Sequence, residues 1–154
     1  MAQTQCGFLD APGVRARDLL ISIGPTLKVD IGFDPSYDGR NPRRPPDLAM
    51  RNVWALIDTG ATDCCIDSDL AMQLQLPIID QRTYSGISGP MNVNMHLAQI
   101  HTPNLSFTLY GSFAGVNLSG GGQRHAVLIG RSYLQHFTLT YHGPDGAVDL
   151  SDPI

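Results

Sequence analysis

Ala55-Leu56-Ile57-Asp58-Thr59-Gly60-Ala61-Thr62 is the most informative run of this 154-residue sequence. Its apolar first half predicts a buried β-strand over about Asn52 to Ile57. Asp58 and Thr59 then favour a tight turn, and Gly60 lets another backbone or a ligand come close. The run therefore predicts a carboxylate presented at the end of a buried strand, beside a cleft.

Two further features follow this run along the chain. Arg82 to Met95 predicts a β-hairpin around a turn at Gly86 to Pro90. Farther on, Val127-Leu128-Ile129-Gly130-Arg131 predicts a short buried strand that ends in glycine, and Ser132 to His136 suits one or two helical turns. The tripeptide Asp-Thr-Gly is too short to indicate a function by itself. The evidence lies in the order in which the strand, the hairpin and the second short strand follow one another.

The rest of the chain predicts a mainly β fold with one or two short helices, a small closed or sandwich-like barrel. We expect one domain over residues 1–154, with a flexible segment at 1–18 and a surface loop insertion at 34–50 that is rich in Pro, Asp, Gly and Arg. A mobile connection is expected from Gly111 to Gly122. Further predicted elements are a strand over Leu19 to Phe33 broken at Gly24-Pro25, a helix over Asp69 to Leu76 capped by Asp67-Ser68, strands at Leu97 to His101 and Leu105 to Tyr110, and a hairpin of Phe137 to Tyr141 with Ala147 to Leu150.

Composition narrows the classes of function. The net charge is −4 and no basic stripe is present, so nucleic acid is not an expected partner. No apolar run has the roughly 18 residues of a membrane span, and the N-terminus lacks a signal-peptide pattern. We expect a soluble intracellular (cytoplasmic) protein, or a soluble domain of a longer one.

Cysteine and histidine positions do not indicate a disulfide framework, a metal or a cofactor. Three cysteines cannot all pair, and the five histidines lack the spacing of a zinc site. The adjacent Cys64 and Cys65 could form a redox switch. Ordinary buried thiols are the favoured interpretation, because nothing basic adjoins them to lower a pKa.

Taken together, the strand with Asp-Thr-Gly-Ala, the glycine-rich hairpin and the Val-Leu-Ile-Gly-Arg segment resemble the retropepsin-like aspartic protease family, in the order that this family keeps. The resemblance covers the chain from about Leu27 onward and is closer to cellular and bacterial members than to viral ones. Viral members often keep an acidic residue after this run that pairs with the arginine, whereas Thr62 and Asp63 follow Ala61 here.

The resemblance implies an aspartic-type endopeptidase, a hydrolase that needs two carboxylates to activate one water. This sequence contains one Asp-Thr-Gly, so the second carboxylate is expected from a symmetry mate. The implied partners are a second copy of the chain, giving a homodimer with one Asp58 from each subunit, and a protein or peptide substrate.

The resemblance also implies roles for individual residues. The catalytic group comprises Asp58, Thr59 and Gly60, with Thr59 bonding across the dimer axis. Ile129, Gly130 and Arg131 are structural residues near the site. Substrate contacts are expected from the flap tip and from pocket residues: Ala61, Tyr84, Ser85, Gly86, Ile87, Ser88, Ala126 and Leu128, with Cys65 as a weaker candidate.

The alternative from another class is a catalytically weak or inactive dimer of the same fold that binds peptide or protein without cleaving it. Intact Asp58, Thr59 and Gly60 argue against this alternative. A serine hydrolase has no support, because the sequence contains no Gly-x-Ser-x-Gly turn.

Overall fold

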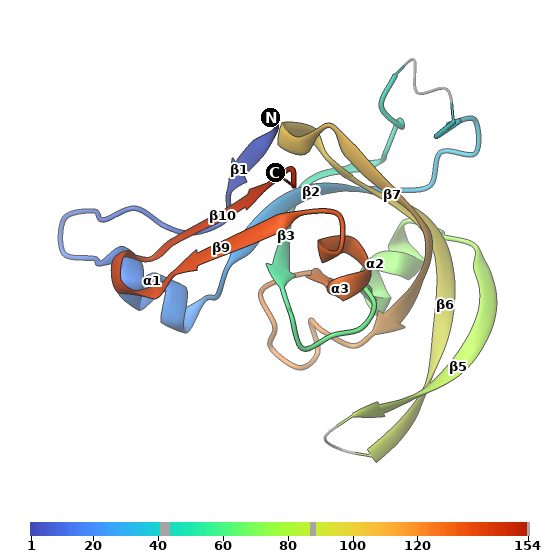
Figure 1. Ribbon diagram of the computed structural model, residues 1–154. Coiled ribbons are helices and arrows are strands. Elements are labelled where there is room, and N and C mark those ends of the chain that lie inside the picture. Colours follow the sequence, from blue (N-terminus) through green and yellow to red (C-terminus); the bar gives the residue numbers. More distant parts are fainter. Residues whose placement is uncertain (41–43, 87–88, 154) are drawn as a thin grey trace.

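The computed structural model describes residues 1–40, 44–86 and 89–153 (Figure 1). Strands dominate this part of the chain: β1 (Gln3–Gln5), β2 (Thr26–Gly32), β3 (Met50–Ile57), β4 (Cys65–Asp67), β5 (Ile78–Gly86), β6 (Gly89–Thr102), β7 (Phe107–Val116), β8 (Val127–Ile129), β9 (Thr138–His142) and β10 (Ala147–Ser151). Short helices join them: α1 (Ala16–Ser22), α2 (Ser68–Gln73), α3 (Arg131–Leu134) and the 3-10 helices η1 (Pro103–Leu105) and η2 (Gly143–Asp145).

The central sheet closes into a barrel. Its hydrogen-bonded order is β2, β3, β8, β4, β7, β6, and β6 pairs again with β2 to complete the circle. The β3–β8 and β4–β7 pairs are parallel, and the other pairs are antiparallel. β5 pairs with the first half of β6 and extends away from the barrel as a hairpin (Figure 1). The prediction of a mainly β barrel with short helices is confirmed.

The core of the barrel comes from alternate residues of its strands. Because successive side chains of a strand point to opposite faces, one face of each strand is buried and the other is not. Buried residues of β2, β3 and β8 are Leu27, Val29, Ile31, Val53, Ala55, Ile57, Val127 and Ile129. Trp54, Leu56 and Asp58 therefore share the outer face of β3 and the turn that follows it.

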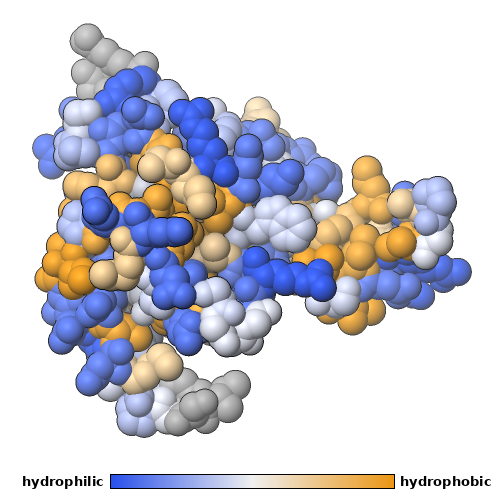
Figure 2. All heavy atoms as spheres, turned by 180° about the vertical axis from the view of Figure 1, so that it is seen from behind, coloured by the Kyte–Doolittle hydropathy of each residue, from blue (hydrophilic) through white to orange (hydrophobic). Residues whose placement is uncertain are grey.

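A second, smaller sheet joins the two ends of the chain in the order β1, β10, β9. The predicted C-terminal hairpin is confirmed by β9 and β10, which pair from Thr138↔Ser151 to His142↔Ala147. Helix α1 packs beside the tip of this hairpin, and together they project from the barrel (Figure 1). Figure 2 shows apolar surface gathered on this projection, where Leu9 and Ile21 are exposed.

The N-terminal region differs from the expectation of a flexible segment over residues 1–18. Gln3–Gln5 forms β1 and pairs with β10, and both Thr4 and Cys6 are buried. The predicted strand is wrong for Leu19 to Ser22, which lie in α1. Helical spacing places Ala16 and Leu20 on one buried face of α1.

The segment from Gly111 to Gly122 also differs from the prediction of a mobile connection. Its first half continues β7 as far as Val116, because Phe113 and Ala114 are buried and pair with β6. The prediction is therefore wrong for Gly111 to Val116, where the apolar residues between the glycines pack in the barrel. No helix in the described ranges is long and apolar enough to cross a membrane.

The loop between β2 and β3 is irregular where it is described, and Asp34 anchors it. Asp34 is 6% exposed. Its carboxylate accepts hydrogen bonds from Arg44 Nη1 at 2.7 Å, from the Asp47 amide at 2.8 Å and from Ser36. Its backbone bonds Gln99 of β6 in both directions. The hydrogen bond from Arg44 is the largest cause that holds the pKa of Asp34 well below its usual range.

This lowered pKa predicts a pH-dependent contribution to stability. A carboxylate whose pKa is lower in the folded state stabilises the fold above its ordinary pKa, and the contribution is lost as the pH falls. Asp34→Asn should therefore lower the melting temperature by several degrees at neutral pH, with a difference that shrinks below about pH 4. Thermal unfolding over a pH series measures this. Asp38→Asn, an exposed change in the same loop, is the control, and an equal, pH-independent loss in both variants would contradict the assignment.

Candidate active site

Asp58 lies where two parallel strands of the barrel end side by side. β3 and β8 are in register, with Ala55 opposite Val127 and Ile57 opposite Ile129. The Asp58 amide continues this pairing by donating to the Ile129 carbonyl at 2.9 Å. The half-buried Asp58 thus follows directly from a buried strand, as the sequence predicts.

A tight turn holds the Asp58 carboxylate. The Gly60 amide donates to Asp58 Oδ1 at 3.0 Å, and the Ala61 amide donates to the Asp58 carbonyl at 3.1 Å. Such a turn fixes the direction of the side chain, because the carboxylate is bonded to its own loop. Thr59 and Gly60 are exposed in this single chain, beside the half-buried carboxylate.

The residues after β8 hold this turn from behind. The amides of Arg131 and Ser132 donate to the carbonyls of Ala61 and Thr62, both at 2.9 Å. Gly130 is buried so tightly that a Cβ there would lie 2.6 Å from the Asp63 carbonyl carbon and 3.0 Å from the Ala61 oxygen. Ile129, Gly130 and Arg131 therefore surround the Asp58 turn.

The Arg131 side chain adds a second connection to the turn. Its Nη1 donates to the Thr59 carbonyl at 2.7 Å, and its Nη2 donates to Thr62 Oγ1 at 3.1 Å. The guanidinium fork thus bonds a hydroxyl where an acidic partner is common in viral members. Among the described residues, no carboxylate lies within ion-pair distance of Arg131.

We predict that Arg131→Met lowers the free energy of unfolding by about 1 kcal/mol, because two hydrogen bonds to the turn are lost while the exposed groups regain water. Arg131→Lys should recover part of this loss, since an ammonium can keep one of the two bonds. Urea unfolding measures both variants. Arg17→Met removes an exposed cation on α1 and serves as the control; a loss of the same size there would contradict the specific role of Arg131.

Two of the predicted substrate-pocket residues share the outer face of the β8 segment, Leu128 within β8 and Ala126 directly before it. Leu128 is half-buried, is opposite Leu56 of β3 and also pairs with Cys65 of β4. Ala126 is half-buried two residues earlier on the same face. These side chains give the surface beside Asp58 an apolar character.

Leu56 is a residue of this surface that the sequence interpretation missed. The buried strand predicted over Asn52 to Ile57 includes Leu56, but its side chain is half-buried and shares a face with Asp58. The sequence contains the information needed to place Leu56, because residues two apart on a strand point to the same side and Leu56 is two residues before Asp58.

The predicted hairpin is confirmed by β5 and β6, which pair as far as Gly86↔Gly89. Tyr84 is half-buried and packs with Cys65 against Val93 and Met95, so the hairpin base meets the barrel beside the Asp58 turn. Burial, followed by the negative charge of Asp63, raises the pKa of Tyr84. Ser85 is exposed. The predicted tip residues Ile87 and Ser88 lie outside the described residues.

Burial disfavours the thiolate form of the two cysteines near the site. Burial raises the pKa of Cys64, and burial together with the charges around it raises the pKa of Cys65 to about 11. The Gly130 amide donates to Cys64 Sγ at 3.4 Å, so this thiol belongs to the packing behind the turn. In residues 1–40, 44–86 and 89–153, no group of three or more His, Cys, Asp or Glu is arranged to hold a metal ion.

One comparison with known proteins identifies a family for this chain. A family model described as aspartyl protease matches residues 48–133, which is more than half of the chain. A search of curated proteins gave no match. The matched part begins just before β3 and ends in α3, so it contains the whole loop system around Asp58. The chain therefore belongs to the aspartyl protease family, as a retropepsin-like member.

Proposed function

We propose that this protein is an aspartic endopeptidase that is active as a homodimer, with one Asp58 from each subunit in a shared site. The observation that carries the proposal is the Asp58 turn itself. A half-buried carboxylate follows a buried strand, accepts the Gly60 amide at 3.0 Å and is held from behind by Arg131. Membership of the aspartyl protease family supports the same chemistry.

We infer a second subunit because the single Asp-Thr-Gly of one chain supplies only one of the two carboxylates that the reaction needs. Asp67 is buried and accepts hydrogen bonds from the amides of Leu70, Leu118 and Ser119, so its carboxylate is occupied in capping α2 and ordering a loop. The sequence has no second Asp-Thr-Gly. A C2 dimer supplies an identical carboxylate on the other side of its axis.

Two features of the surface support a protein partner. Thr59 is exposed beside Asp58, so it is available to bond the equivalent turn of a second copy. The exposed apolar residues on the projection formed by α1 and the β9–β10 hairpin are also typical of association surfaces (Figure 2).

In the proposed reaction, two Asp58 carboxylates share one proton around a water molecule. The ionised carboxylate accepts a proton from the water as its oxygen attacks the scissile carbonyl, and the protonated one donates to the carbonyl oxygen. Two like charges this close cannot both remain ionised at moderate pH, which keeps the shared proton in place. The carboxyl group that took the water proton then gives it to the nitrogen as the peptide C–N bond breaks, and a hydroxyl of the diol returns its proton to the other carboxylate, so the shared proton is restored and no covalent intermediate forms.

We infer a preference for apolar residues beside the cleaved bond. Leu56, Leu128 and Ala126 are half-buried on the face that Asp58 shares, and a substrate side chain would complete their burial. The β5–β6 hairpin, with Ser85 and Gly86 at the end of β5, would act as a flap over the bound peptide.

The test compares purified wild type with Asp58→Asn on a mixed peptide library at several pH values, with a pepstatin-type inhibitor in parallel. Wild type should cleave, the inhibitor should block cleavage, and the variant should be at least about 1,000-fold slower. Equal cleavage by both proteins would overturn the proposal. Peptide binding by a wild type that never cleaves would instead identify a binding module of the same fold.

A further inference from the structure

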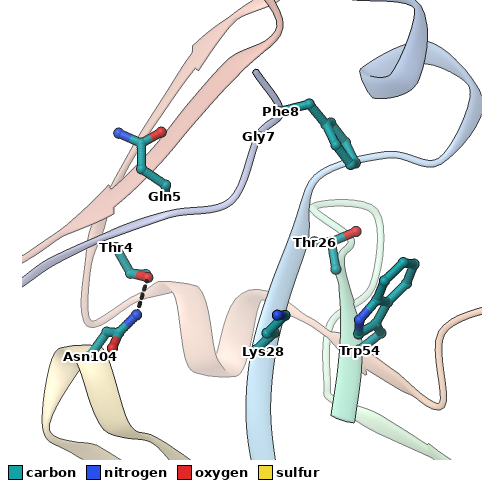
Figure 3. A pocket seen from close by; sticks show the side chains of 8 residues that line it. All are labelled: Thr4, Gln5, Gly7, Phe8, Thr26, Lys28, Trp54 and Asn104. Atoms are coloured by element: carbon teal, nitrogen blue, oxygen red, sulfur yellow. Dashed lines mark hydrogen bonds between the residues drawn. The ribbon is translucent and has the colours of Figure 1, made fainter. Parts of the chain in front are cut away.

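A pocket of about 300 Å³ lies on the outer side of the barrel (Figure 3), and no residue of the Asp58 turn lines it. Three parts of the chain form it: the N-terminal segment around β1, the outer face of β2 and β3, and η1. The residues that line it are Thr4, Gln5, Gly7, Phe8, Thr26, Lys28, Trp54 and Asn104. This volume is at the lower end of the range for small-ligand sites.

Lys28 and Trp54 form the floor of this pocket. They are directly opposite each other on β2 and β3, so both project from the same outer face. Trp54 is 43% exposed, which leaves part of a large ring available to a ligand. In Figure 3 the rings of Phe8 and Trp54 lie on one side, Thr4, Gln5 and Asn104 on the other, and Lys28 between them.

The floor is held in place by His125, a buried residue directly before the predicted substrate-pocket residue Ala126. Its ring lies 6.1 Å from that of Trp54, and its Nε2 is 2.7 Å from Thr26 Oγ1. Its Nδ1 is 3.0 Å from Gln123 Oε1. Desolvation lowers the pKa of His125, so the ring that supports the pocket favours its neutral form. The pocket floor is thus built on a buried hydrogen-bonded support.

The pocket is positively charged in a protein that is negative overall. Lys28 is the only lysine of the sequence, whose net charge is −4. None of the lining residues is acidic, and within the described residues no carboxylate lies within ion-pair distance of Lys28. Asp149, which lies outside the lining, accepts from the Gln3 and Gln5 side chains. A ligand anion would therefore meet an ammonium without a competing carboxylate in the pocket wall.

We propose that this pocket binds an apolar carboxylate, with a flat hydrocarbon group against Trp54 and Phe8 and its carboxylate on Lys28. The Asn104 side chain, which donates to Thr4 Oγ1 at 3.1 Å, retains a second N–H for a carboxylate oxygen. Such a ligand is either a free organic acid or the C-terminal residue of a peptide. The proposal does not depend on the peptidase activity of the Asp58 site.

Trp54 provides the readout, because it is the only tryptophan of the chain. A ligand in this pocket must contact its ring, so tryptophan fluorescence reports binding at this place. The probes are 3-phenylpropionate as a free acid and N-acetylphenylalanine as a peptide end. Their neutral amides, 3-phenylpropionamide and N-acetylphenylalaninamide, match them in shape and lack the charge.

We expect a saturable change of Trp54 emission with the acids and at least about tenfold weaker binding of the amides, a difference typical of a charge-assisted hydrogen bond. Tighter binding of N-acetylphenylalanine would identify a peptide end, and tighter or equal binding of 3-phenylpropionate a free acid. No saturable change up to about 10 mM, or equal responses to acids and amides, would overturn the proposal.

Variants separate the role of Lys28 from a general effect of charge. Lys28→Gln should weaken binding of the acids at least about tenfold, whereas Lys28→Arg should retain it. Arg51→Gln removes the same charge from an exposed position on β3 outside the pocket, and it should bind as wild type does. Unchanged binding by Lys28→Gln with an unchanged melting temperature would contradict the site. If Arg51→Gln weakens binding equally, the effect of Lys28 is only a long-range electrostatic attraction, and the proposed site is overturned.

Discussion

A ninefold excess of Asp58→Asn subunits, refolded together with a fixed amount of wild type, should reduce peptide cleavage to about a tenth. The reason is statistical. If each active site needs one Asp58 from each of two subunits, random pairing places most wild-type chains with a variant partner, and those mixed dimers lack the second carboxylate. If each chain were active by itself, the added variant chains would leave the rate of cleavage per wild-type chain unchanged.

The measurement is the rate of cleavage per wild-type chain as the proportion of variant rises. Asp69→Asn is the matched control, because it removes an exposed carboxylate on α2 outside the Asp58 turn. Excess Asp69→Asn subunits should add activity, not remove it. If excess Asp58→Asn leaves the rate per wild-type chain unchanged, the shared-site proposal is refuted, even if Asp58 proves catalytic.

Gly130→Ala is expected to disrupt the site by displacing the backbone that supports the Asp58 turn. Its Cβ would lie 2.6 Å from the carbonyl carbon of Asp63 and 3.0 Å from the Ala61 oxygen, and both contacts are backbone. The loop that carries Asp58 would have to move, because no rotamer can relieve a clash with backbone atoms. We expect a loss of about 3 kcal/mol in the free energy of unfolding. Cleavage by the fraction that folds should fall at least about 100-fold.

Gly111→Ala is the control for this change. A Cβ at Gly111 of β7 would meet no atom within 4 Å, so the substitution should alter stability by less than about 0.5 kcal/mol. Urea unfolding and the cleavage assay are applied to both variants. A Gly130→Ala protein as stable and active as Gly111→Ala would show that the closeness of Gly130 to the turn is not required.

Elements that depend on local pattern could be predicted from the sequence. The strand before Asp58 is a short apolar run that ends in turn residues, and the β5–β6 and C-terminal hairpins combine an apolar period of two with turn residues. Helix α2 was also predictable, since Asp67 caps it by accepting the Leu70 amide. The helix ends at Gln73, three residues before the predicted end at Leu76.

Elements that depend on distant partners could not be predicted in this way. Leu19 to Ser22 is apolar enough for a strand, but Leu20 is buried as part of a helix beside the C-terminal sheet. β1 is only three residues long, and its partner β10 lies at the other end of the chain. Local propensity carries no information about such a partner, so tertiary packing decided both elements.

The sequence by itself determined the Asp58 run, its turn and the Gly130-Arg131 segment, because these rest on residue types at short spacing. Tertiary structure decided how they meet. Parallel pairing of β3 with β8 brings Ile129 to the Asp58 amide, and the backbone of Arg131 and Ser132 then bonds the turn. It also decided that Leu56 faces the site and that Lys28 and Trp54 share a pocket. These neighbours are set by strand register across the barrel, which no local pattern encodes.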